Sequence, residues 1–66
     1  MTDTELERLR NPPCTIQLRE KDGYRPPPFY VTHTLLQPEA VLMYEFDGRE
    51  YHYEGCFCFD EIESVT

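Results

Sequence analysis

The stretch YEFDGREYHYEG, residues 44–55, decides how this chain folds, because an aspartate-glycine pair stands between runs of alternating aromatic and charged residues. Alternation of apolar and polar residues is typical of a β-strand with one buried face. A two-residue type I′ turn needs positive φ at both central residues, a conformation that Asp47-Gly48 adopts readily. The sequence therefore predicts a β-hairpin built from residues 41–46 and 49–53.

The predicted turn also fixes which hairpin residues lie opposite one another, and it places Glu45 across from Glu50. The face expected in the core carries Leu42, Tyr44, Phe46, Tyr51 and Tyr53. The face expected in solvent carries Val41, Met43, Glu45, Glu50, His52 and Glu54. Like charges directly opposite each other destabilise a sheet by up to ~1 kcal/mol. The pair is therefore either tolerated on a solvated face or used for binding.

The remaining segments predict one mostly-β domain that spans residues 1–66. Thr4 and Glu7 have the spacing of a capping box, which indicates a short helix, or alternatively a frayed arm, in residues 1–12. Residues 14–20, 29–36 and 56–59 alternate as strands, and residues 60–65 form a turn plus a strand or one helical turn. Residues 25–28 are extended and form a rigid proline connector or, alternatively, a ligand for a proline-recognising groove. Residues 13–66 are expected to form a four- to five-stranded antiparallel sheet or a small SH3/Sm-like barrel.

The charge of the chain is concentrated in its C-terminal part. Residues 1–38 hold five acids and five bases, whereas residues 39–66 hold eight acids and the single Arg49, which gives the net charge of −7. A negative field repels phosphate, so we expect no direct binding of nucleic acid. The same field attracts a protein with a basic surface, including a surface built to hold nucleic acid.

The three cysteines and the apolar runs indicate where the protein works. An odd, low cysteine count without an apolar N-terminal run predicts a cytoplasmic protein rather than a secreted disulfide scaffold. No apolar run reaches the length of a membrane span, so no membrane contact is expected. Cys56 and Cys58 are expected to pack in the core, because cysteine behaves as a small buried hydrophobe.

Neither a metal nor a catalytic site is predicted. Cys56 and Cys58 are separated by one residue where a zinc knuckle has two, and no second pair accompanies them. No phosphate-binding glycine loop or nucleophile motif is present, and a chain of this size offers little room for a cleft. We therefore expect a protein that is not an enzyme and needs no cofactor.

Part of the chain resembles the Rof-type inhibitors of the Rho termination factor, which are small Sm-like barrels. The matching pieces are TIQLREKDG (residues 15–23), VLMYEF (41–46) and FCFDEIESV (57–65), while three prolines at 26–28 stand where such barrels run a regular strand. That family uses an acidic surface to occupy the RNA-binding region of its target. The resemblance implies a barrel fold and an inhibitory function.

A second resemblance is to the phage-encoded inhibitors of uracil-DNA glycosylase, which are acidic mimics of DNA. The similar stretch is VLMYEFDGREYHYEG, residues 41–55, about a quarter of the chain. This resemblance implies a phage protein that antagonises a host or defence enzyme by mimicry of nucleic acid.

The sequence thus predicts a non-enzymatic inhibitor that occupies the basic nucleic-acid-binding site of a target protein. The acids would supply charge, and tyrosine, histidine and methionine would supply contact area. The predicted partner-binding residues are Met43, Glu45, Asp47, Glu50, Tyr51, His52, Tyr53, Glu54, Asp60 and Glu61. The alternative is a structural or assembly subunit, such as a homodimer, that pairs through a sheet edge without mimicry of nucleic acid.

Overall fold

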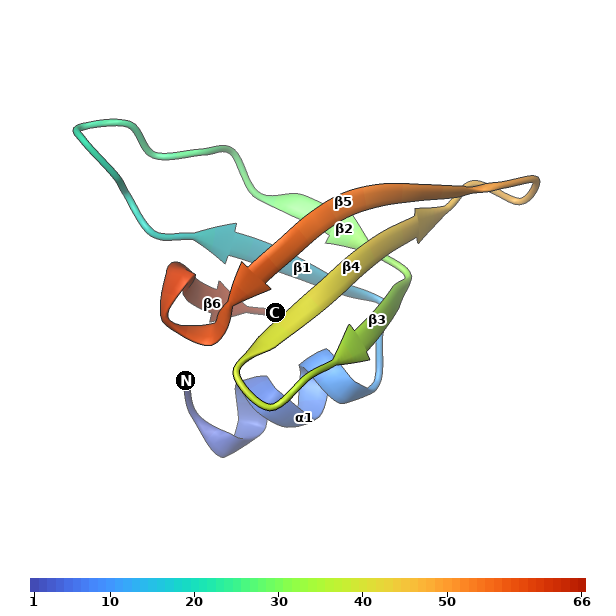
Figure 1. The fold of residues 1–66 in the computed structure, drawn as a ribbon, viewed down its shortest axis with the longest axis horizontal. Coiled ribbons are helices and arrows are strands. Elements are labelled where there is room, and N and C mark those ends of the chain that lie inside the picture. The colour runs from blue at the N-terminus through green and yellow to red at the C-terminus, as the bar shows by residue number, and fades with distance from the viewer.

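The computed structural model describes residues 1–66 as a short helix followed by six strands (Figure 1). The elements are α1 (Asp3–Arg10), β1 (Cys14–Leu18), β2 (Phe29–Val31), β3 (His33–Leu36), β4 (Ala40–Phe46), β5 (Tyr51–Cys58), the 3-10 turn η1 (Phe59–Glu61) and β6 (Ile62–Val65). The strands form two antiparallel sheets, β2-β1-β6 and β3-β4-β5, and no closed barrel. The predicted mostly-β class with a short N-terminal helix is confirmed.

The helix begins two residues earlier than the predicted capping box. Thr2 is the N-cap, and its hydroxyl accepts a hydrogen bond from the Glu5 backbone while the Glu5 carboxylate accepts one from the Thr2 backbone. The second oxygen of Glu5 accepts the Val65 N–H at 3.1 Å, which ties the helix to β6. This tertiary contact favours Glu5 over Glu7 as the capping carboxylate, so the Thr4 prediction is wrong.

The predicted single strand over residues 29–36 is broken at Thr32. The Thr32 hydroxyl accepts the Phe46 N–H at 2.7 Å, and the Thr32 N–H donates to the Tyr44 carbonyl at 3.0 Å. The chain therefore leaves the first sheet with β2 and joins β4 with β3. The break also changes which residues face inward: Val31 is fully buried, whereas His33 and Leu35 are exposed.

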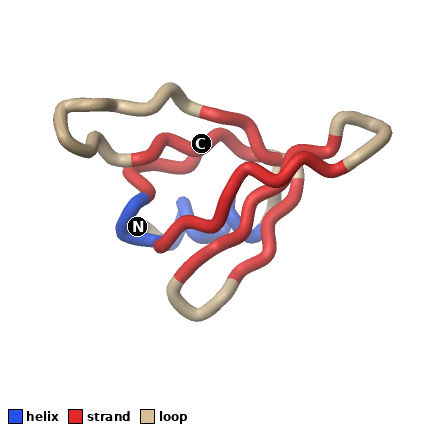
Figure 2. Tube along the Cα trace, turned by 45° about the horizontal axis from the view of Figure 1, so that its top comes forward, coloured by secondary structure: helices blue, strands red, loops and turns tan.

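The core lies between the two sheets and is closed on one side by α1, as Figures 1 and 2 show. Its buried members are Leu9, Cys14, Ile16, Val31, Val41, Met43, Ile62 and Val65, with Phe57 and Phe59 among the partly buried residues packed against them. The Thr34 hydroxyl donates to the Leu9 carbonyl at 2.7 Å, so the helix end is bonded to β3. Aliphatic side chains, with Cys14 and Met43, and not the tyrosines, thus form the buried core.

The segment between β1 and β2 runs along the surface without regular structure over residues 19–28, apart from an isolated bridge between Lys21 and Tyr24. The side chain of Gln17 donates to the Pro26 carbonyl at 2.8 Å. The Arg25 guanidinium forms a two-pronged ion pair with the Glu63 carboxylate, whose second bond is 3.0 Å long. These contacts hold the predicted proline connector against the first sheet.

Candidate docking surface on the β4–β5 hairpin

The hairpin turn lies one residue further along the chain than predicted. Asp47 and Glu50 close it, since the Asp47 N–H donates to the Glu50 carbonyl, and only Gly48 (φ 99°) of the central pair Gly48-Arg49 has positive φ. The Asp47 carboxylate accepts the N–H groups of Arg49 at 2.8 Å and Glu50 at 2.9 Å. An aspartate that bonds backbone N–H groups two and three residues on belongs at the first position of a turn. The predicted turn at Asp47-Gly48 is therefore wrong.

The moved turn changes the pairing of the two strands by two residues. Phe46 pairs with Tyr51 and Tyr44 with Tyr53, and Glu45 lies opposite His52 rather than Glu50. The predicted juxtaposition of two glutamates does not occur. A shift of two residues preserves the faces, so the aromatic side chains still share one side of the hairpin.

His52 lies among carboxylates at the end of the hairpin. Its Nε2 atom is 2.7 Å from an Asp47 oxygen and 3.9 Å from a Glu50 oxygen. The hydrogen bond to Asp47, followed by the negative charges of Asp47, Glu50 and Glu45, raises the pKa of His52. The same bond, together with the Glu50 and Arg49 backbone N–H groups, lowers the pKa of Asp47 to about 2. The acids thus bind a histidine instead of facing each other.

The face predicted to be solvent-exposed is the one that enters the core. Val41 and Met43 are fully buried, so Met43 cannot serve as the predicted contact residue on the surface. Tyr51 and Tyr53 are 60% and 59% exposed, and the face predicted for the core is open to solvent. The β2-β1-β6 sheet and α1 cover the aliphatic side, and nothing in this chain covers the aromatic side.

β5 contains a bulge near residue 54, and this bulge determines which of the following residues face the core. The pairing shifts between Met43 and Tyr44, so Glu54 has no partner in the ladder and Gly55 lies opposite Met43. Gly55 has φ of 137°, and a Cβ atom there would be 2.8 Å from the Phe57 ring. The bulge turns Phe57 toward the core and leaves Cys56 and Cys58 exposed, so these two cysteines do not pack in the core as predicted. Cys14 is the buried cysteine.

We call the uncovered side of the β3-β4-β5 sheet the outer face. Its members follow from the strand pairing: His33, Leu35, Leu42, Tyr44, Phe46, Tyr51, Tyr53, Cys56 and Cys58. Tyr51 meets the ring of Phe46 at a centroid distance of 4.7 Å and that of His33 at 5.0 Å, and Tyr44 meets Tyr53 at 5.4 Å. No lysine, arginine, aspartate or glutamate belongs to this face.

The predicted acidic residues do not form one surface. Glu45, Asp47, Glu50 and Glu54, together the acidic tip, lie on the end of the hairpin that projects from the body of the molecule (Figure 1). Asp60 and Glu61 lie in η1, beyond the other end of β5. The eight residues of β5, at ~3.3 Å each, separate Glu50 from η1 by roughly 26 Å, and four of them separate Glu54 from η1. The structure brings Tyr51, His52 and Tyr53 beside the acidic tip and leaves Asp60 and Glu61 apart.

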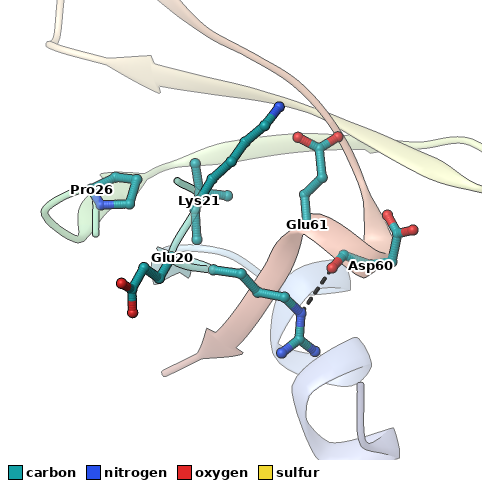
Figure 3. Close-up of a pocket in the computed structure, with 7 residues that line it drawn as sticks. Glu20, Lys21, Pro26, Asp60 and Glu61 are labelled. Atoms are coloured by element: carbon teal, nitrogen blue, oxygen red, sulfur yellow. Dashed lines mark hydrogen bonds between the residues drawn. The ribbon is translucent and has the colours of Figure 1, made fainter. Parts of the chain in front are cut away.

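Asp60 and Glu61 line a shallow cleft with a volume of about 370 Å³ (Figure 3). Arg19 bridges it, donating from Nε to the Asp60 carbonyl at 2.8 Å and from its backbone to the Glu61 carbonyl at 2.9 Å. Lys21 and Glu61 extend in the same direction beside it. With acids and bases mixed and a single apolar residue in its lining, the cleft does not assemble a nucleophile with an orienting base.

Asp47, Glu50 and His52 form the group in the chain with the geometry of a metal site, with one ligand atom from each within 4.8 Å of the others. All three side chains are exposed, and Asp47 already bonds His52 and two backbone N–H groups. Exposed acidic groups of this kind are common without an ion, and we assign no metal to them.

Sequence reasoning placed Tyr51 and Tyr53 in both the core and the contact surface, and it missed His33, Leu35 and Phe46 as surface residues. The signal that could have found them is the second apolar set on β4, Val41 and Met43. These unbranched or aliphatic side chains resemble the core residues Ile16, Val31 and Ile62 of the other strands more than the tyrosines do. Comparison with protein-family models, with curated proteins and with solved structures finds no match. No helix of this chain is both long and apolar enough to cross a membrane.

Proposed function

We propose that this protein is a non-enzymatic binding domain that docks on the basic nucleic-acid-binding site of a target protein and excludes nucleic acid from it. The observation that carries the proposal is the acidic tip, which projects from the body with few counter-ions of its own. Its acids pair only with His52, and Glu45, Glu54 and Arg49 take part in no ion pair. Such a group of carboxylates is free to replace phosphates in a basic groove.

Two further features support docking at this end of the molecule. All seven excess negative charges belong to residues 39–66, so the field that steers a basic partner originates in the half of the chain that forms the hairpin. The outer face begins at the acidic tip and supplies aromatic surface that a contact can desolvate. Inhibition then requires no chemistry, only occupancy of the site.

The test is capture of partners from cell lysate with the tagged protein, at low and high salt and with added duplex DNA or RNA. We expect a nucleic-acid-binding protein that is retained at low salt, released at high salt and displaced by nucleic acid. Its affinity is then compared for the wild type and the variant Glu45→Gln/Glu50→Gln. The two lost charges, at about 0.5–1 kcal/mol each, should weaken binding by roughly 5- to 30-fold and flatten its salt dependence.

The matched control is Glu20→Gln/Asp22→Asn, which removes the same charge from the loop at the other side of the molecule, where asparagine tolerates the positive φ of Asp22 (53°). It should retain affinity to within a factor of two. Equal weakening in both variants would reduce the proposal to a net-charge effect, and unchanged affinity in the tip variant would contradict it.

The second candidate is an assembly subunit, and one observation favours it. β5 is an edge strand of eight residues, so its outer backbone groups are free to pair with another strand. This function predicts a homodimer whose dissociation barely changes between low and high salt. Sedimentation at both salt concentrations separates the two candidates, because the docking domain stays monomeric without its partner.

A further inference from the structure

The outer face is an apolar surface that the chain leaves without a cover. Leu35, Phe46, Tyr51 and Tyr53 are between 37% and 60% exposed, and Leu42 and Tyr44 connect them across the three strands. The remaining aromatic members, His33 and Tyr44, lie next to them on β3 and β4. Contiguous exposed apolar surface of this kind marks a contact site more often than scattered apolar residues do.

The rings on this face support one another and form a fixed platform. Tyr51 lies between Phe46 and His33 with centroid distances of 4.7 and 5.0 Å, and Tyr44 and Tyr53 form the second pair at 5.4 Å. The Thr32 hydroxyl is 2.9 Å from Nδ1 of His33, which orients that ring. A face whose rings are already ordered loses little conformational entropy when a partner binds.

The charges around the platform select a cationic occupant. The outer face carries no charge itself, and the acidic tip lies at the end of the hairpin that carries Tyr51 and Tyr53. The carboxylates of Asp47 and Glu50 gather around His52, on the other side of the strands from these two rings. A second copy of this chain would bring a second acidic tip against the first. A single-stranded nucleic acid, which also stacks on tyrosines, would bring phosphates against the same carboxylates. A positively charged protein segment satisfies both the rings and the acids.

Among cationic side chains, arginine fits this combination best. Its planar guanidinium stacks on aromatic faces, is less strongly hydrated than the ammonium of lysine, and pairs in two-pronged fashion with carboxylates. We infer that the outer face binds an arginine-bearing segment of a basic protein, with guanidinium groups stacked on Tyr51 and Tyr53 and with other basic side chains of the same segment paired with the acidic tip. The inference rests on the proposed function, since it names the side chains that the basic target contributes.

The experiment compares two unstructured peptides of equal length and charge, nona-arginine and nona-lysine, titrated into the isotopically labelled protein at moderate salt. Amide chemical shifts locate the binding face and give both dissociation constants. We expect nona-arginine to bind roughly 5- to 30-fold more tightly, which corresponds to two stacked guanidinium groups, with the largest shifts on β4 and β5. In Tyr51→Leu/Tyr53→Leu this preference should fall to a factor of two or less.

The control is Tyr24→Leu/Tyr30→Leu, because these tyrosines are 64% and 50% exposed and lie outside the outer face. It should retain the full preference for arginine. The single variants Tyr51→Leu and Tyr53→Leu, each expected to lose part of the preference, replace the double variant should it fail to fold.

The outcomes separate the inference from the proposed function. Equal binding of both peptides, or an arginine preference that survives Tyr51→Leu/Tyr53→Leu, overturns the inference. If Glu45→Gln/Glu50→Gln still weakens the binding of both peptides in that case, the acidic tip binds basic segments without the outer face, and the proposed function is retained. If neither peptide responds to salt or to the charge variant, the proposed function fails as well. Tighter binding of a single-stranded oligonucleotide than of either peptide overturns both.

Discussion

The two faces of the β3-β4-β5 sheet differ in a way that composition alone does not reveal. The inner face presents Val41 and Met43, both fully buried, whereas the outer face presents Tyr51 and Tyr53, both more than half exposed. The larger side chains, the aromatic rings with their polar hydroxyl groups, are thus the ones left in solvent. In a chain this short, the side of a sheet that becomes core is the side that a second layer can reach, and α1 with the β2-β1-β6 sheet reaches only the aliphatic side.

The largest expected effect comes from exchanging one residue on each face for alanine. Met43→Ala leaves a cavity in the core and should lower the free energy of unfolding by about 2–5 kcal/mol, enough to unfold much of a small domain. Tyr53→Ala removes an exposed ring in contact with Tyr44 and should lower it by about 1 kcal/mol or less. Urea denaturation followed by circular dichroism measures both. The reverse order of the two effects would place the aromatic face in the core and contradict the fold.

A smaller effect is expected at the bulge in β5, which turns Phe57 toward the core and leaves Cys56 and Cys58 on the outer face. Gly55→Ala places a methyl group against the Phe57 ring at a positive φ, and we expect a loss of about 1–3 kcal/mol. Gly23→Ala is the control, since its φ is 79° but nothing lies within 4 Å of the added carbon. The difference between the two melting temperatures isolates the contact with Phe57. Equal losses would mean that this ring does not lie over Gly55.

The smallest effect concerns the acidic tip, where the inner side of the hairpin passes beyond the core. Nuclear magnetic resonance titration should give His52 a pKa above its ordinary value of about 6.5, because Asp47 bonds the charged ring. Asp47→Asn keeps an oxygen for the turn but removes the charge, so it should lower this pKa. Asp60→Asn, the same change at the far end of β5, should leave it unchanged.

The sign of the stability effect follows from the two pKa values. The raised pKa of His52 contributes stability below about pH 6.5, which is lost as pH rises through the folded-state value. The lowered pKa of Asp47, about 2, contributes stability above about pH 4, which is lost as pH falls through that value. The contact therefore stabilises the hairpin most fully between about pH 4 and 6.5. An unchanged His52 titration in Asp47→Asn would show that the two side chains do not meet.

Two aspartate-glycine pairs show how far local sequence predicts the turns. Asp22 and Gly23 both have positive φ, at 53° and 79°, as a type I′ turn requires, and Lys21 bridges to Tyr24 around them. At Asp47-Gly48 the same dipeptide forms a different turn, because the carboxylate of Asp47 bonds the next backbone N–H groups and His52. The existence of both turns was predictable. The position of the second depended on the bonds of the Asp47 carboxylate, including the one to His52 on the opposite strand.

The periodicity of the strands likewise predicted which residues share a face but not which face is buried. Strand alternation divides β4 into Val41 and Met43 on one side and Tyr44 and Phe46 on the other, and both sets are apolar enough for a core. The choice is made by tertiary contacts from α1 and the first sheet, which lie far away in the sequence. For the same reason, the sequence predicted the acidic tip as a segment, but it did not predict that the aromatic face beside it is exposed.

The measurement that tests docking most directly is hydroxyl-radical footprinting of the protein, free and bound to the nucleic-acid-binding protein that it captures. Tyr24, Tyr30, Tyr51 and Tyr53 are all at least half exposed in the free chain, so each should react before binding. Docking through the acidic tip and the outer face predicts that the partner protects Tyr51 and Tyr53 and leaves Tyr24 and Tyr30 reactive. Protection of Tyr24 and Tyr30, with Tyr51 and Tyr53 still reactive, would contradict it.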